Sequence, residues 1–206
     1  VKIDGLDWSF NMKLSKDFKE IKGDASFRKF YRNTKKNSVI VFANREKIKN
    51  LLIYDSINKI LIKNDIIAPK LLSQDYKNNY IEIQYLGNKT IYQKFSKNKK
   101  NQYLIFKKAI NVLNKIQLVK DKKIKNFINK FYLIKDYKNN ILLDEAKLFS
   151  DWYVPKKLNK KKINIFNNKF NNEIKLLLLK LNFKNVTFVH RDFHVSNLII
   201  NSKNQI

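Results

Sequence analysis

The sequence predicts an α+β fold with two lobes, an N-terminal lobe built on an antiparallel sheet and a mainly helical C-terminal lobe. Up to about residue 86, short runs alternate apolar and polar residues, which is the period of a half-buried strand. Beyond it, apolar residues recur every three or four positions, which is the period of an amphipathic helix. A polar loop between two short apolar runs, at residues 188–200, suggests a functional loop held by strands. We expect the lobes to be residues 1–86 and 87–206.

In the N-terminal lobe, two strand hairpins are expected with one helix between them. The strands show the alternation of apolar and polar residues, and polar turns rich in Lys and Asn join them. The helix is predicted because five apolar residues recur at helical spacing after Glu46. The expected strands are residues 27–32, 38–43, 70–74 and 80–86, and the expected helix is residues 46–63.

The C-terminal lobe is expected to be a set of amphipathic helices whose apolar stripes form a core. Residues 84–88 would be the crossing between the lobes. A nucleotide base could bind to free backbone groups of such a linker, although a plain linker has the same pattern. The expected helices are residues 101–119, 124–132, 142–153 and 163–181.

Composition excludes several classes of protein. The chain has no cysteine, so disulfides and thiolate metal sites are excluded. Its only histidines, His190 and His194, fall in one motif, which excludes a cluster of histidine ligands. No apolar run is long enough to span a membrane, and the first ten residues lack the order of a signal peptide. We expect a cytoplasmic protein that does not bind membranes.

The formal net charge of +27 would ordinarily indicate a nucleic-acid partner. Here nearly all of it is lysine, spread along the chain among Asn and Ile, and no nucleic-acid-binding motif accompanies it. We therefore expect no specific nucleic-acid binding. The arginines are few, and where lysine is so common they mark positions at which the planar guanidinium matters. They are Arg28, Arg32, Arg45 and Arg191.

His190, Arg191, Asp192 and Asn197 match the H-R-D-x-x-x-x-N pattern of the protein-kinase catalytic loop. Phosphoryl transfer needs a carboxylate that orients the attacking hydroxyl and accepts its proton, which suits Asp192. It also needs an oxygen ligand for the Mg²⁺ that bridges the nucleotide phosphates, which suits Asn197. The alternative is a polar turn between strands, where Asp, Ser and Asn are common.

Two further stretches carry candidate binding residues. Gly23, Asp24 and Ser26 precede the first expected hairpin, where backbone N–H groups could cover phosphate oxygens, although an ordinary turn has the same composition. Residues 142–153 combine acids with aromatic residues in an otherwise lysine-rich chain, which suits a polar, partly apolar ligand such as a sugar. A plain amphipathic helix is the alternative there.

Three stretches together, residues 23–32, 143–153 and 189–198, resemble the signature stretches of a bacterial branch of the aminoglycoside/choline kinase superfamily. This branch includes the anomeric kinases of N-acetylmuramate and N-acetylglucosamine, which recycle cell-wall sugars. The order and spacing match over nearly the whole chain. Arg191, where many aminoglycoside kinases have Gly, favours this branch over the drug-modifying enzymes.

The resemblance implies a protein-kinase-like fold that binds ATP and Mg²⁺ and phosphorylates a sugar. Asp192 would be the catalytic base and Asn197 a metal ligand. Gly23, Asp24, Ser26 and Arg28 would bind the cofactor, although bracing of the hairpin is an open alternative for Arg28 and Arg32. Candidates for contact with the acceptor sugar are Glu145, Asp151, Trp152 and His194.

The chain departs from the family pattern at two places. Residues 39–43 contain no lysine to grip the nucleotide phosphates, so Arg28, Arg32 or Arg45 would have to supply that charge. No acidic residue follows Asn197, although the family places a second Mg²⁺ ligand there. The resemblance thus implies that these residues are the front part of a longer kinase and are inactive alone.

Two alternatives remain open. One is a kinase for another hydroxylated small molecule, such as an aminoglycoside or choline, because Glu145 and Asp151 could hold a cationic acceptor. The other is a non-catalytic, basic nucleic-acid-binding or scaffold protein derived from a kinase fold. Binding with a steep salt dependence and no effect of ATP would favour the second.

Overall fold

The computed structural model describes residues 16–21, 28–97, 101–181 and 187–206. The chain divides into two compact units, which we describe separately. The larger unit comprises residues 1–134 and 190–206, and the smaller one comprises residues 135–189. The predicted lobe boundary at residue 86 falls inside the larger unit, and the two-lobe division stays a prediction.

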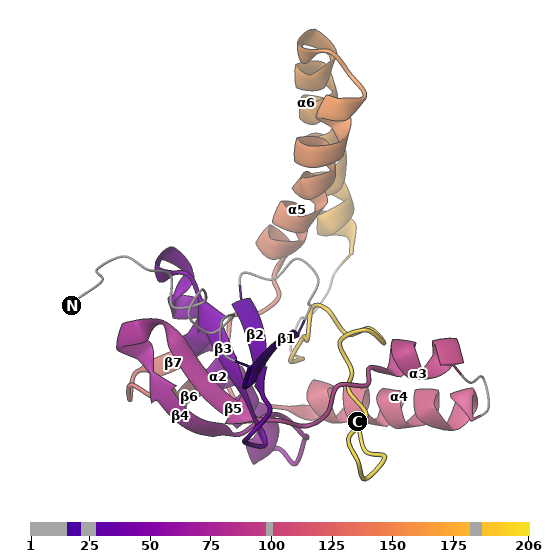
Figure 1. The fold of residues 1–206 in the computed structure, drawn as a ribbon. Coiled ribbons are helices and arrows are strands. Elements are labelled where there is room, and N and C mark those ends of the chain that lie inside the picture. The colour runs from indigo at the N-terminus through magenta and orange to yellow at the C-terminus, as the bar shows by residue number, and fades with distance from the viewer. Residues whose placement is uncertain (1–15, 22–27, 98–100, 182–186) are drawn as a thin grey trace. The chain divides into compact units, whose positions relative to one another are not determined.

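The larger unit is built on a five-stranded antiparallel sheet with the strand order β1-β2-β3-β5-β4 (Figure 1). All six residues of β3 are buried, as expected for the strand at the centre of a sheet. β3 pairs with β2 from Arg28↔Ala43 to Asn33↔Ser38 and with β5 on its other side. The strands are β1 Phe18–Ile21, β2 Arg28–Asn33, β3 Ser38–Ala43, β4 Leu71–Asp75 and β5 Tyr80–Gln84.

The four strands expected in the N-terminal lobe are all present, within two residues at each end. The expected helix is α2, Lys49–Lys63, preceded by a short 3₁₀ turn. β1 was not expected, because four residues are too short to show a period.

The sheet has an apolar cluster on each face. Side chains alternate along β3, so that Val39, Val41 and Ala43 pack with Leu51 of α2 on one face. Ile40 and Phe42 pack with Tyr31 on the other face. α2 therefore covers one side of the sheet through the odd-numbered positions of β3.

Two helices follow the sheet, α3 (Ile91–Lys97) and α4 (Gln102–Leu118), and they lie side by side (Figure 1). The aromatic rings of Phe95 and Phe106 join them, with 4.9 Å between centroids. α4 was predicted, but α3 was not. The sequence signal for the start of α3 is a capping box formed by Thr90 and Gln93. The Thr90 hydroxyl accepts a hydrogen bond from Gln93 N, and the Gln93 side chain accepts one from Thr90 N.

The helix predicted over residues 124–132 is wrong. The chain forms a small hairpin there, of β6 (Lys123–Lys125) and β7 (Phe131–Leu133). The side chain of Asn126 accepts hydrogen bonds from the backbone N–H groups of Ile128 and Lys130, at 3.1 Å each. Asn129 has φ 58°, which an Asn tolerates in a turn. These local bonds compete with a helix and bend the chain back on itself.

The smaller unit contains two helices, α5 (Asn139–Leu148) and α6 (Lys160–Lys180), which confirm the helices predicted there. α5 runs into a π-helical turn, Phe149–Tyr153, and a 3₁₀ turn, Val154–Lys156. The ring of Phe149 contacts Phe166 and Phe170 of α6, with centroids 6.2 and 5.7 Å apart. This aromatic contact holds the two helices together.

The Arg32 side chain connects the turn between β2 and β3 to the linker that follows β5. Its guanidinium donates to the carbonyl oxygens of Asn33, Lys36 and Ser38 and stacks over the Tyr85 ring, 3.8 Å from the centroid. It thus closes the turn between β2 and β3 and fixes this turn to the linker.

Replacing Arg32 with Gln should lower the free energy of unfolding by about 2 kcal/mol, because three backbone carbonyls lose a charged donor. Chemical denaturation followed by circular dichroism measures this. Arg45→Gln, at an exposed arginine, is the control and should change the value by less than about 0.5 kcal/mol. Equal losses in the two variants would contradict a specific role for Arg32.

Candidate active site

The polar loop at residues 190–197 lies in the larger unit, and backbone bonds to the start of α3 hold it. Tyr92 N donates to Val195 O at 3.1 Å, and Ile91 N donates to Leu198 O at 2.9 Å. The strands predicted on either side of the loop are wrong, because the described residues there form only one isolated bridge, Thr90↔Ile199. The segment after the loop pairs with the linker instead of with the segment before the loop.

The side chains of Asp192, His194 and Asn197 converge within this loop. Asn197 Nδ2 donates to Asp192 Oδ2 at 2.6 Å and to the Asp192 carbonyl at 3.1 Å. His194 Nε2 lies 3.1 Å from Asp192 Oδ1. The Asp192 side chain is 71% exposed, so the carboxylate is held by its neighbours and still open to a ligand.

The amide of Asn197 is oriented in a way that suits a metal ligand. Both bonds to Asp192 use its nitrogen, which leaves the amide oxygen Oδ1 to coordinate a cation. Mg²⁺ is commonly held by one or two protein oxygens and by substrate phosphates. Among the described residues, no group of three or more His, Cys, Asp or Glu could hold a metal by itself. The amide oxygen of Asn197 could be one such protein ligand.

His194 was expected near the acceptor, and the structure places it against the candidate base. Ser196 N donates to His194 Nδ1 at 3.3 Å, which puts the proton of a neutral ring on Nε2. That N–H can then donate to Asp192 Oδ1. The ring thus helps to orient the carboxylate.

The ring of His190 packs edge-to-face with the ring of Phe193, with 5.5 Å between the centroids. Its Nδ1 is buried and has no hydrogen-bond partner in the described part of the chain. Burial lowers the pKa of His190, and the nearby Asp192 carboxylate opposes this only in part.

Because its folded pKa is lowered, His190 should stay neutral in the folded chain while the unfolded chain takes up a proton below about pH 6.5. The free energy of unfolding should therefore fall as the pH drops below that value. His190→Phe keeps a ring of similar shape and should show a shallower fall. Urea titrations of both chains between pH 7.5 and 5 measure this, and identical slopes would contradict it.

Arg191, just before the candidate base, has φ 69°, in the left-handed region that favours glycine. The left-handed backbone turns the chain sharply between His190 and Asp192.

Arg191→Gly and Arg191→Ala both remove the side chain, so their difference isolates the backbone effect. The Gly variant should be more stable than the Ala variant by about 1 kcal/mol. Thermal unfolding of the two variants gives the comparison. An Ala variant of equal or greater stability would contradict the left-handed backbone at this position.

The candidate cofactor residues are only partly described. Gly23, Asp24 and Ser26 lie outside the described residues. Arg28 begins β2, and its guanidinium lies over the Tyr54 ring of α2, 4.8 Å from the centroid. The rings of Tyr54 and Tyr85 each contact an arginine of β2. No pattern in the sequence distinguished these two tyrosines from the others.

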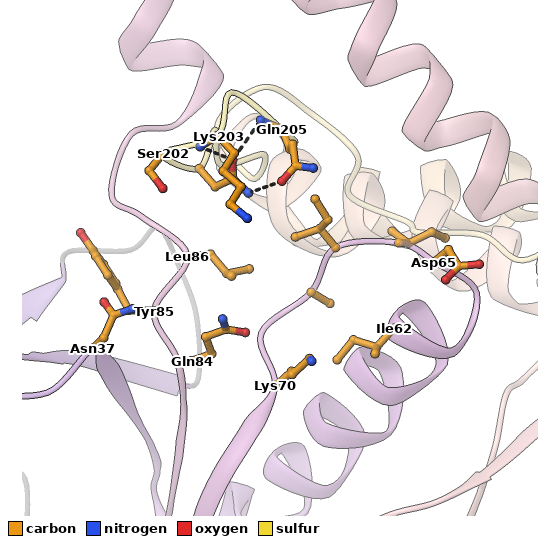
Figure 2. Close-up of a pocket in the computed structure, with 14 residues that line it drawn as sticks. Asn37, Ile62, Asp65, Lys70, Gln84, Tyr85, Leu86, Ser202, Lys203 and Gln205 are labelled. Atoms are coloured by element: carbon orange, nitrogen blue, oxygen red, sulfur yellow. Dashed lines mark hydrogen bonds between the residues drawn. The ribbon is translucent and has the colours of Figure 1, made fainter.

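The linker between β5 and α3 borders a cavity of about 470 Å³ (Figure 2). The linker residues Gln84, Tyr85 and Leu86 form one side of it. None of the candidate catalytic side chains lines it. The cavity therefore adjoins the segment expected to bind a nucleotide base, but not the loop that carries Asp192. The other lining residues are Asn37, Ile62, Asp65, Ile66, Ile67, Ala68, Lys70, Asn201, Ser202, Lys203 and Gln205.

Glu145, Asp151 and Trp152 belong to the smaller unit. Glu145 accepts a hydrogen bond from the hydroxyl of Tyr137. Asp151 Oδ1 accepts from Ser150 Oγ at 3.2 Å, and the Trp152 side chain is 70% exposed. The four expected acceptor residues are thus divided between the two units, since His194 lies beside Asp192 in the larger one.

The sheet, the helices and the loop with Asp192 and Asn197 define a kinase-like phosphotransferase fold. The family model described as "Phosphotransferase enzyme family", APH, matches residues 17–206, and the chain belongs to this family. No curated protein sequence gives a significant match.

A solved structure, described as the streptomycin–ATP–APH(2")-IIa ternary complex, is similar with a TM-score of 0.50 and 14% sequence identity. The match covers 86% of this chain and 61% of that chain. It confirms the predicted α+β, kinase-like fold. In the described part of the chain, no helix has the length and apolarity needed to cross a membrane.

Proposed function

We propose that this chain belongs to a small-molecule kinase that transfers the γ-phosphoryl group of ATP to a sugar hydroxyl. The observation that supports it is the contact of Asp192 and Asn197, in which the amide nitrogen fixes the carboxylate and leaves the amide oxygen for a metal. A polar turn without a catalytic role would not need this arrangement.

In this proposal each side chain of the loop has one task. Asp192 accepts a hydrogen bond from the acceptor hydroxyl and takes its proton as the bond to phosphorus forms. Asn197 Oδ1 and the nucleotide phosphates would hold Mg²⁺, whose positive charge neutralises the charge that develops on the transferred group. His194 keeps the carboxylate oriented through Oδ1.

We further propose that the acceptor is the anomeric hydroxyl of an N-acetylated amino sugar, as in cell-wall sugar recycling. The support is the resemblance of the three signature stretches and the character of residues 143–153. An exposed indole such as Trp152 can stack on the apolar face of a sugar ring, and carboxylates such as Glu145 and Asp151 accept hydrogen bonds from hydroxyls.

An aminoglycoside is the second candidate acceptor. The observation in its favour is that the similar solved structure is described as a complex with streptomycin and ATP. The same acids, Glu145 and Asp151, would bind the amino groups of such a cation. The same experiment tests choline as the acceptor. Transfer to none of the acceptors would favour the other alternative, a non-catalytic protein that binds nucleic acid through its charge of +27.

Transfer of labelled phosphate from γ-labelled ATP should be measured against a panel of acceptors: N-acetylglucosamine, N-acetylmuramate, streptomycin and choline. The assay uses the 206 residues beside a version continued past Ile206 by a strand that bears a second acidic ligand. We expect Mg²⁺-dependent transfer to the N-acetylated sugars by the continued version. Asp192→Asn should reduce it by at least about a hundredfold, because proton acceptance is lost.

A Lys77→Gln variant serves as the control, since it removes an exposed charge from the turn before β5 without touching the three converging side chains or the cavity at the linker. Its rate should stay within about twofold of the unchanged chain. Phosphate on streptomycin alone would make the aminoglycoside the acceptor. No labelled product on any acceptor, with a folded protein, would contradict the kinase proposal.

A further inference from the structure

We propose that Arg28 is the cation that grips the phosphates of ATP in this chain, in place of a lysine on the third strand. This inference rests on the proposed function, because it identifies a residue of the same nucleotide site. In protein kinases a lysine on the third strand contacts the phosphates. The third strand here, β3, has the sequence SVIVFA and carries no charge.

The strand pairing places Arg28 beside the end of β3. Arg28 pairs with Ala43, the last residue of that strand. Ala43 and Phe30 both belong to the apolar cluster on the α2 face of the sheet. Because side chains alternate along a strand, Arg28 shares this face with Phe30, and its contact with Tyr54 of α2 agrees. The positively charged side chain of Arg28 therefore lies on the face of the sheet that α2 covers, and it comes from β2, the strand next to β3.

Two other arginines near the sheet are less suited to the task. The guanidinium of Arg32 is already used by three backbone carbonyls and stacks on Tyr85. Arg45 is exposed in the 3₁₀ turn after β3 and does not belong to the sheet. Of the three arginines, Arg28 has the position from which it could act in place of a lysine on β3.

The surroundings of Arg28 would strengthen its hold on an anion. The side chain is half-buried, so its charge is less hydrated than that of an exposed arginine, and this burial lowers its pKa. A cation with little water around it gains more from a phosphate than an exposed one does. The guanidinium lies over the Tyr54 ring, and its N–H donors lie along the edge of the planar fork. The ring can thus hold the group in place while the edge binds phosphate oxygens.

The direction of β2 agrees with an extended nucleotide. Arg28 and Arg32 are four residues apart on one strand face, which is about 13 Å. Arg32 and Tyr85 mark the linker end of this face, where a base is expected. Arg28 lies at the other end and directly follows the turn expected to cover the phosphates. Base and phosphates would then lie along the strand.

The test measures the affinity of the 206-residue chain for ATP, ADP and adenosine by calorimetry. Arg28→Gln should weaken ATP and ADP by about tenfold or more, because a charge-assisted contact is lost, and should leave adenosine within about twofold. Lys29→Gln is the matched control. Lys29 pairs with Phe42, whose side chain lies on the other face, so this variant removes the same charge without affecting ATP.

The outcomes separate the possibilities. A proportionate loss of ATP and adenosine in Arg28→Gln, or an equal loss of ATP in Lys29→Gln, would overturn the role of Arg28 and leave the proposed function standing. Absence of ATP binding by the unchanged chain would overturn both. Should Arg28→Gln fail to fold, Arg28→Lys keeps the charge without the planar fork and should lose ATP affinity several-fold at unchanged adenosine affinity. Equal losses of affinity for ATP and for adenosine in Arg28→Lys would then overturn the inference.

Discussion

The backbone pairing between the linker and the segment after the polar loop is the constraint on which the site depends. Ile91 N donates to Leu198 O, and Ile200 N donates to Lys89 O, at 2.9 and 3.0 Å. Gly87 in the linker has φ 132°, a backbone conformation that residues with a side chain rarely adopt. Through this pairing, the segment that leaves the sheet also holds one end of the loop with Asp192. The candidate base Asp192, the histidine beside it and the candidate metal ligand are then positioned by a few local bonds.

The sheet contributes the other part of the proposed site, through the two arginines on one face of β2. Each of them contacts a tyrosine, Arg28 contacting Tyr54 of α2 and Arg32 contacting Tyr85 of the linker. Arg32 has three backbone carbonyls as partners and closes a turn, whereas Arg28, at the opposite end of the strand, is the arginine that we propose for the phosphates. The two similar residues would then have different roles in the same strand.

Much of the fold followed from the sequence, because alternation is strong wherever a strand has one buried face. β2, β3, β4 and β5 are of this kind, and so are the long amphipathic helices α2, α4 and α6. The hairpin β6–β7 was mistaken for a helix, because its form depends on side-chain bonds of Asn126 that periodicity does not contain. The strands predicted on either side of the loop at residues 190–197 are also wrong, because the segment after the loop forms only an isolated bridge with the linker.

For the candidate site, the motif at residues 190–197 was sufficient to predict that Asp192 and Asn197 come together. It was not sufficient to place His194, because contacts two residues apart depend on loop geometry. The assignment of the arginines also required the structure, since strand register decides which face and which end each one occupies. Functional residues that act through long side chains are therefore harder to predict from a sequence than those fixed within one loop.

The π-helical turn at Phe149–Tyr153 has a consequence for how acceptor preference could change. In a regular α-helix, residues seven positions apart such as Glu145 and Trp152 share a face. The wider turn holds an additional residue and shifts Trp152 relative to Glu145. Loss of a single residue in this turn would restore the regular helix and present a different set of side chains to a ligand. A family could thus acquire a new acceptor through one deletion, without any change in the residues that transfer phosphate.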